Sequence, residues 1–189
     1  MRAQRPSHSA PVIAAMAETL PFADNAIDAS MAIVTVHQWA DLGRGLAELR
    51  RVTRGPVVVV TGDGAALDRF WLAAYAPELI AVEQRRCPAI DMIRNLLGGP
   101  TEVRTISVPI DCVDGFAEAY YARPERFLDQ RVRRAQSAWT FLPPGLEDEI
   151  VARLRADLES GAWDARFGAW RTLPEFEGSM RLIIGHQAN

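Results

Sequence analysis

The sequence predicts an α/β domain built on an open sheet whose main strands are parallel. Two short apolar runs, 27–36 and 56–61, have the length of strands and do not alternate polar with apolar residues, which indicates burial on both faces. Between them, apolar residues recur at helical spacing at Leu42, Leu46, Leu49 and Val52. A strand, a helix and a second strand in this order predict a parallel pair joined by a right-handed crossover.

The composition is that of one globular unit. The chain has 189 residues, of which 49% are hydrophobic, enough for one core but not for two. We therefore expect a single domain over 1–189. The longest apolar runs fall short of the roughly 18 residues of a membrane span, and no secretory apolar stretch follows the first residues, so we expect a cytoplasmic protein.

Charge and cysteine content narrow the range of partners. The formal net charge is -3, and the basic residues form no stripe that would neutralise a phosphate backbone, so nucleic acid is not an expected partner. Cys87 and Cys112 lack the paired spacing of a metal site or a disulfide framework. Free thiols and no bound metal are expected.

The first half of the chain contains two further features. A weaker apolar stretch at 11–15 is interpreted as a short strand, and loop chemistry follows at 18–25. Asp41 precedes the predicted helix and is a candidate N-cap. Open sheets of this kind bind ligands beyond the carboxyl ends of their strands, so 35–41 and 61–64 form the candidate binding rim.

The second half is predicted to be mostly helical. Pro77 and Pro88 interrupt a helical region that ends at Gly98-Gly99, so its helices should be short and bent. A strand that closes the sheet is expected near the C-terminus, and 114–160 is interpreted as a helical lid or insertion. In chain order, the predicted elements are a helix at 67–74, a strand at 103–110, helices at 115–122, 130–140 and 146–158, and a strand at 180–185.

Several local strings, in a fixed order, resemble a known family. They are Ala17-Glu18-Thr19-Leu20-Pro21-Phe22-Ala23-Asp24, then Ile27-Asp28 opening a strand, then His37-Gln38-Trp39 with Asp41, then Leu46-x-Glu48-Leu49-x-Arg51-Val52. Together they resemble the small-molecule branch of class I S-adenosylmethionine-dependent methyltransferases, similar to the menaquinone and ubiquinone biosynthesis enzymes. The resemblance implies a partial Rossmann-like methyltransferase sheet with an antiparallel C-terminal edge.

The same resemblance implies a methyl donor, S-adenosylmethionine, and a place for it. The loop at Met16, Ala17 and Glu18 would lie beside the adenine, although the family commonly has an acidic residue where this chain has Met16. The family's glycine-rich turn after its first strand, and the acidic residue after its second strand, have no counterpart here. We therefore expect a chain that lacks the N-terminal donor-binding part, with an exposed sheet edge along which two copies could pair as a homodimer.

Each candidate site residue has an alternative structural role. His37 at the rim is a candidate general base, or a hydrogen-bonded loop histidine. Trp39 and Asp63 are candidate substrate contacts, although Asp63 also suits an ordinary turn. Two tyrosines and a tryptophan in the insertion could form an aromatic substrate pocket or pack in a core: Tyr120, Tyr121 and Trp139.

Two hypotheses for function remain open. The first is methyl transfer from S-adenosylmethionine to a small molecule, with donor and acceptor held in alignment and His37 as the base. The second is a non-catalytic binding or dimerising pseudoenzyme, which the missing glycine-rich turn favours. An α/β-hydrolase is excluded, because the chain has no GxSxG elbow.

Overall fold

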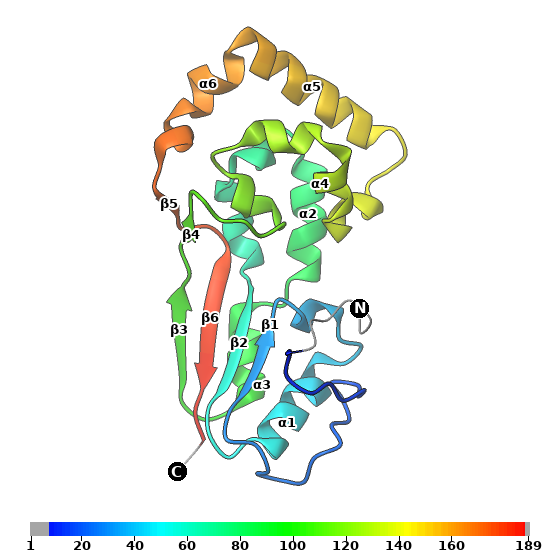
Figure 1. The fold of residues 1–189 in the computed structure, drawn as a ribbon, viewed down its shortest axis with the longest axis vertical. Coiled ribbons are helices and arrows are strands. Elements are labelled where there is room, and N and C mark those ends of the chain that lie inside the picture. Colours follow the sequence, from blue (N-terminus) through cyan, green and yellow to red (C-terminus); the bar gives the residue numbers. More distant parts are fainter. Residues whose placement is uncertain (1–7, 188–189) are drawn as a thin grey trace.

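The computed structural model describes residues 8–187 and contains a four-stranded mixed sheet. The strands lie in the order β1-β2-β6-β3, and Figure 1 shows them in the lower half of the molecule. β1 and β2 are parallel, whereas β6 is antiparallel to both of its neighbours. This confirms the α/β fold with an antiparallel C-terminal edge. The bounds are β1 Ser30–Ile33, β2 Val57–Gly62, β3 Thr101–Thr105 and β6 Met180–Gly185.

The predicted final strand is placed inside the sheet. β6 has the predicted bounds, and it lies between β2 and β3. Its residue Ile183 faces Val59 on one side and Val103 on the other, and is fully buried. β3 is therefore the edge strand on that side of the sheet, opposite the β1 edge.

Two helices cover one face of this sheet. α1 (Leu42–Val52) and α3 (Ile90–Leu97) pack on a core that also contains residues of three strands. The Asp41 carboxylate accepts a hydrogen bond from the Arg44 N–H at 2.9 Å, which confirms the predicted N-cap. The buried core residues on this face are Ala32, Val36, Leu46, Val57, Val59, Ile93, Leu97 and Ile183.

The opposite sheet face has no such core in the described part of the chain. Successive side chains of a strand point to opposite faces, so the residues between the buried ones belong to the second face. Met31 and Ile33 of β1 are 61% and 58% exposed. The register continues this apolar surface inward, because Met31 pairs with Val58 and Ile33 with Val60. An uncovered apolar face thus extends from the β1 edge.

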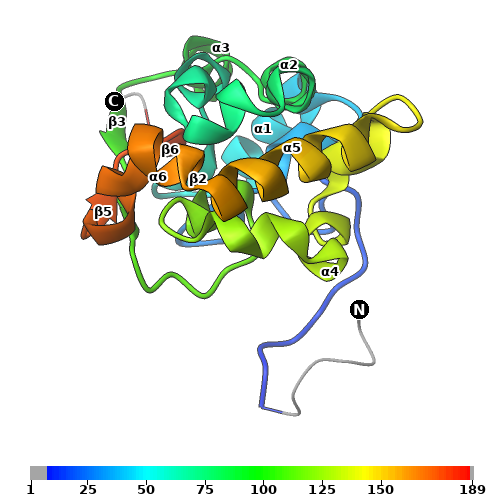
Figure 2. The same ribbon diagram turned by 90° about the horizontal axis from the view of Figure 1, so that it is seen from above.

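The helical part stands beyond the carboxyl ends of β1 and β2, at the top of Figure 1, where α5 and α6 arch over the shorter helices. Seen from above, α5 crosses over this part of the molecule (Figure 2). Its α-helices are α2 Pro77–Arg86, α4 Gln130–Arg134, α5 Leu146–Ser160 and α6 Ala162–Phe167. Its 3-10 helices are η3 Gly64–Arg69, η4 Trp71–Ala74, η5 Ala117–Tyr120, η6 Pro124–Leu128, η7 Ser137–Phe141 and η8 Gly168–Thr172.

Several predicted helices are shorter than their apolar spacing indicated. The predicted helix 67–74 is instead two 3-10 helices separated at Phe70, which has extended backbone angles. The predicted helix 130–140 is likewise divided at Gln136, and 115–122 contains only η5. In these segments the aromatic side chains pack into a core on more than one side of the chain, and not along one face of a helix. The spacing of apolar residues therefore did not predict the length of the helices.

Two of the predicted strands are shorter in the structure than predicted, and a third does not form. Within 27–36 only β1 forms, because Val34 has a positive φ of 46°, and η2 (Val36–Gln38) follows. The stretch 11–15 is not a strand. The segment 103–110 is divided into β3 and the short β4 (Val108–Pro109), which pairs with β5 (Glu175–Phe176) in a second, two-stranded sheet.

The helical part has its own aromatic core, which continues past both ends of 114–160. Trp71 is 2% exposed and contacts the Trp163 ring edge to face at 5.4 Å between ring centroids. Phe70 before the predicted insertion and Phe176 after it join the same cluster. The aromatic core is therefore formed jointly by the segment 114–160 and by residues before and after that segment.

Candidate functional site at the carboxyl ends of the parallel strands

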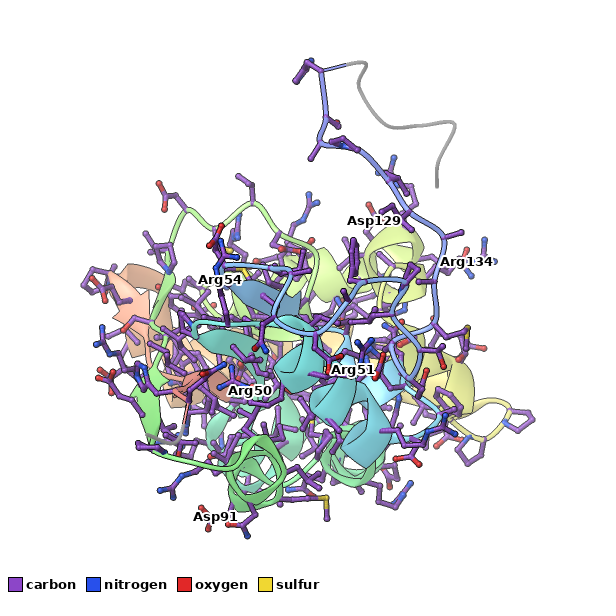
Figure 3. The ribbon with its side chains drawn as sticks, turned by 90° about the horizontal axis from the view of Figure 1, so that it is seen from below. Arg50, Arg51, Arg54, Asp91, Asp129 and Arg134 are labelled. Atoms are coloured by element: carbon purple, nitrogen blue, oxygen red, sulfur yellow. The ribbon has the colours of Figure 1, made fainter. Side chains whose placement is uncertain are left out.

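The loop 16–24 is held on α1 by one glutamate and one arginine. The Leu20 N–H donates to Glu48 Oε2 at 2.8 Å, and Arg51 donates to the Leu20 and Phe22 carbonyl oxygens at 3.1 and 2.9 Å. Arg51 also forms an ion pair with Asp24 at 2.7 Å. Figure 3 labels Arg51 on α1 beside Arg50. Two of the segments that carry the family resemblance, the loop before β1 and helix α1 after it, are thus joined in one hydrogen-bond network.

The candidate donor contacts lie at the start of this loop. Glu18 Oε1 accepts a hydrogen bond from the Asp41 N–H at 3.1 Å, and this bond holds the pKa of Glu18 below its usual range. The Thr19 N–H donates to the Met16 carbonyl at 3.1 Å, which closes a tight turn around Ala17. These residues therefore stand next to the first turn of α1, at the carboxyl end of β1. Their contact with a methyl donor stays a prediction.

His37 lies on η2, shortly after the end of β1 at Ile33, and is half-buried. Its Nε2 is 3.3 Å from the side-chain amide nitrogen of Gln38, which is positioned to donate to it. Burial lowers the pKa of His37, and the positive charge of Arg86 lowers it further. The imidazole is therefore neutral at neutral pH, the form that can accept a proton.

Trp39 packs against helix α1. A Cβ added to Gly45 would lie 2.8 Å from the ring atom Cζ3 of Trp39, so the indole rests directly on the helix backbone. The side chain is partly buried with the core of the helix-covered sheet face. The structure thus gives Trp39 a packing role, and its substrate contact stays a prediction.

Arg86 connects the rim to the helical part and was missed by the sequence reasoning. Its guanidinium donates to Ser137 Oγ at 3.0 Å, lies 5.1 Å from the Phe141 ring centroid and is 3.6 Å from Glu83. Its charge acts on His37 across the rim. No spacing in the sequence singles out this residue, because it is one of two adjacent arginines at the end of α2.

A cleft of about 550 Å³ opens at the carboxyl end of β2. Asp63 lines it, as the rim prediction anticipated, together with residues from the end of α2 and the start of α3. Asp63 Oδ1 accepts from the Ala65 N–H at 3.1 Å and Oδ2 lies 3.1 Å from Arg181. The full lining is Asp63, Gly64, Ala65, Gln84, Cys87, Ala89, Ile90 and Asp91.

A buried carboxylate fixes the wall of this cleft from the other side. Glu118 is 2% exposed and accepts hydrogen bonds from the Ser179 N–H at 2.9 Å and from Ser179 Oγ at 2.7 Å. Ser179 in turn accepts from the Asp63 N–H at 2.8 Å through its carbonyl oxygen. A Cβ at Gly178 would lie 2.6 Å from the Glu118 carboxyl carbon, so only glycine permits this approach. Burial raises the pKa of Glu118.

The three aromatic candidates of the insertion lie in the aromatic core. Tyr121 is fully buried, and its hydroxyl donates to the Leu173 carbonyl at 2.7 Å. Tyr120 and Trp139 are 9% and 4% exposed, and both pack against Phe127. None of the three lines the cleft at Asp63. Their placement agrees with the packing alternative, and a substrate pocket formed by them stays a prediction.

Both cysteines are free thiols, as expected, and both are half-buried. Within residues 8–187 no three or more His, Cys, Asp or Glu side chains gather as metal ligands. In the same part of the chain, no helix has both the length and the apolar character needed to cross a membrane.

Comparison with known proteins agrees with this fold. A methyltransferase domain family matches residues 1–60. The structure of a protein from Anabaena variabilis ATCC 29413, whose name proposes a methyltransferase from an antibiotic biosynthesis pathway, overlaps with a TM-score of 0.85 at 29% identity. That overlap covers 93% of this chain and 72% of the Anabaena chain. No curated protein matches.

Two further solved structures are more distant. A SAM-dependent methyltransferase from Thermotoga maritima overlaps 92% of this chain and 62% of its own at 12% identity and a TM-score of 0.45. The YcgJ protein from Bacillus subtilis overlaps 92% and 69% at 16% identity and a TM-score of 0.48. These two overlaps are too loose to bear on function. The overlap with the Anabaena structure shows that the described chain has the Rossmann-like fold of methyltransferases, and residues 1–60 match a methyltransferase domain family.

Proposed function

We propose that the protein belongs to S-adenosylmethionine-dependent methyltransferases of the menaquinone- and ubiquinone-biosynthesis-like branch and acts on a small molecule. The observation that carries this proposal is the attachment of loop 16–24 to α1 through Glu48 and Arg51. This network uses residues on which the family resemblance rests, and a separate hydrogen bond from the Asp41 N–H to Glu18 holds the start of the loop at the N-terminus of α1. Ligands of open α/β sheets bind at the carboxyl ends of the strands.

The described residues fit the donor on one side only. The turn at Ala17 and Glu18 offers the backbone beside which the resemblance places the adenine. The glycine-rich turn that lets a backbone approach the donor closely, and the carboxylate that would hold the ribose hydroxyls, do not occur at the required places in the sequence. These residues alone therefore do not complete a donor site.

The proposed contribution of His37 is proton removal from the acceptor. Its imidazole is neutral at neutral pH because burial and Arg86 both disfavour the charged form. A neutral histidine at the rim is suited to take a proton from a substrate hydroxyl or ammonium group.

Calorimetric titration of the 189-residue chain with S-adenosylmethionine and S-adenosylhomocysteine tests the proposal. Micromolar binding that weakens in Arg51→Ala and persists in Arg44→Ala supports it, because Arg44 is an exposed arginine of the same helix outside the network. A folded chain that binds neither compound contradicts donor binding by these 189 residues and favours the second candidate function.

The second candidate is a non-catalytic, dimerising module, and the uncovered sheet face favours it. β1 is an edge strand of the described sheet, with Met31 and Ile33 exposed on the apolar face. Exposed apolar edge strands tend to pair with another chain. We propose that a second copy pairs along β1.

Sedimentation velocity over a range of protein concentrations tests this pairing. Ile33→Lys should shift the protein to monomer, whereas Met92→Lys, which changes a 53% exposed residue on α3, should not. A wild-type protein that stays monomeric at every concentration contradicts the dimer.

A further inference from the structure

The cleft at the end of β2 combines acidic groups with a small apolar floor. Two carboxylates line it, Asp63 and Asp91, whereas no lysine or arginine does. Ile90 and the side chains of Ala65 and Ala89 supply the apolar part. At about 550 Å³ the cleft is within the size range of small-molecule sites.

The arginines that pair with these carboxylates also bind groups outside the cleft lining. Arg181 is 12% exposed and also donates to the Gly178 carbonyl at 2.9 Å, on the side of the buried Glu118. Arg94 donates to Thr101 Oγ1 at 3.0 Å as well as to Asp91, so it is directed toward β3. The charged side chains of the cleft lining are therefore two carboxylates, and the arginine paired with each of them lies outside that lining.

Asp63 retains capacity for a ligand. A carboxylate has about four acceptor positions, and two of those on Asp63 are used by the Ala65 N–H and Arg181. Its backbone is fixed by the bond from its N–H to Ser179, whose own N–H and hydroxyl are held by Glu118. The acceptor is thus pre-positioned on a rigid strand end.

The thiol of Cys87 reports the electrostatics of the cleft. Burial is the main cause that raises its pKa to about 11; the negative charges of Glu83, Glu118 and Asp63 act in the same direction and the charge of Arg86 opposes them. Negative groups thus outnumber positive ones around a side chain that lines the cleft. This potential favours a cation over an anion.

We propose that this cleft is a binding site for a small molecule that carries a protonated amine, with the ammonium group on Asp63 and its apolar portion against Ile90. The site does not depend on methyl transfer, because neither His37 nor loop 16–24 lines it. A chain that fails to bind S-adenosylmethionine would therefore leave this inference standing.

Protection of Cys87 from alkylation by N-ethylmaleimide tests the site, with benzylamine as the probe and benzyl alcohol as its neutral counterpart. At about pH 8 an alkylamine is protonated. The thiolate is the reacting form of cysteine, and the raised pKa of Cys87 makes its alkylation slow, so the labelling is followed over a long time course. Peptide mass spectrometry measures Cys87 and Cys112 separately, so Cys112 serves as the internal control. We expect benzylamine to protect Cys87 at a concentration roughly tenfold below that needed for benzyl alcohol.

Three variants complete the test. Asp63→Asn should abolish the preference for the amine, and the exposed Asp91→Asn should weaken it, whereas Glu159→Gln, an exposed carboxylate on α5, should leave it unchanged. Asp91→Asn keeps the test decisive if the loss of the Asp63 turn contacts prevents folding. Equal protection by amine and alcohol, or no protection by either, overturns the proposal.

Discussion

The carboxylate of Glu48 receives two hydrogen bonds from the guanidinium of Arg51, at 2.7 Å from Nε and 2.8 Å from Nη2. This bidentate pair then binds both polar backbone groups of one loop residue. The Leu20 N–H donates to Glu48, and the Leu20 carbonyl accepts from Arg51. Each side chain thus orients the other while both hold the loop, so the pair acts as a unit.

Replacing Arg51 should release the loop without unfolding the sheet. Arg51→Ala removes the contacts to the Leu20 and Phe22 carbonyls and to Asp24, so cleavage within 16–24 during limited proteolysis should become faster. Arg51→Lys should be intermediate, because lysine keeps the charge but loses the bidentate geometry. Arg44→Ala is the matched control and should be cleaved at the wild-type rate; equal rates for Arg51→Ala and Arg44→Ala would refute the role of the pair.

The contribution of Glu48 to stability should depend on pH in a defined range. Hydrogen bonds from Arg51 and from the Leu20 N–H lower its pKa from 4.5 to about 2. A carboxylate with a depressed folded-state pKa contributes stability above the unfolded value of 4.5, and the contribution is lost as the pH falls toward about 2. The difference in Tm between wild type and Glu48→Gln should be constant near neutrality and shrink below about pH 4.5. A difference that does not change down to about pH 2 would contradict this assignment.

The two glycines of α1 should respond to alanine in opposite directions. A Cβ at Gly45 would clash with the Trp39 ring, whose Cζ3 alone would be 2.8 Å away, so Gly45→Ala should displace the indole and lower the free energy of unfolding. At Gly43 the nearest atom would be Asp41 Oδ1 at 3.4 Å, an ordinary contact, and Gly43→Ala should stabilise by up to about 1 kcal/mol through helix propensity. Urea denaturation of both variants measures the contrast, and a stabilising Gly45→Ala would show that Trp39 does not pack on the helix as described.

These glycines also show what local sequence predicts well. The helix around Gly43 and Gly45 was identified correctly because its apolar stripe and its Asp41 cap agree, and α1 forms at 42–52. The strand 56–61 was identified for the same reason, with β2 displaced by one residue at each end. In the aromatic part, the helix predicted at 146–158 forms as α5. The helices predicted at 67–74, 115–122 and 130–140 do not form at those lengths, because their lengths depend on tertiary packing, such as that of Trp71 between Trp163 and Phe127.

The sequence predicted the part of the candidate site that lies at the strand ends. It did not predict the residues that reach the site through contacts between segments distant in the chain. The rim prediction placed His37 and Asp63 at the ends of β1 and β2, since parallel strands end on one side of the sheet. Glu118 and Arg86 were missed as site residues. Ser179 is 61 residues from Glu118, and Ser137 is 51 residues from Arg86, so no sequence spacing could link these partners.

Removing the charge of Arg86 should raise the pKa of His37. Burial makes the larger contribution to the lowered pKa, and the guanidinium adds to it. In Arg86→Gln the imidazole should therefore titrate at a higher pH than in wild type while staying below 6.5, because burial remains. Arg85→Gln is the matched control, since Arg85 is its exposed neighbour on α2, and it should leave the titration unchanged.

Proton NMR of the imidazole signals measures these values, with His37→Asn used to assign the resonance among the three histidines. The effect on stability follows from the sign of the shift. A histidine whose folded-state pKa is depressed contributes stability above its unfolded value of 6.5, and this contribution is lost as the pH falls through the folded value. Acid sensitivity should therefore decrease in Arg86→Gln. A wild-type His37 that titrates at or above 6.5 would show that the imidazole is charged at the rim, and His37 would then be unsuited to act as the base.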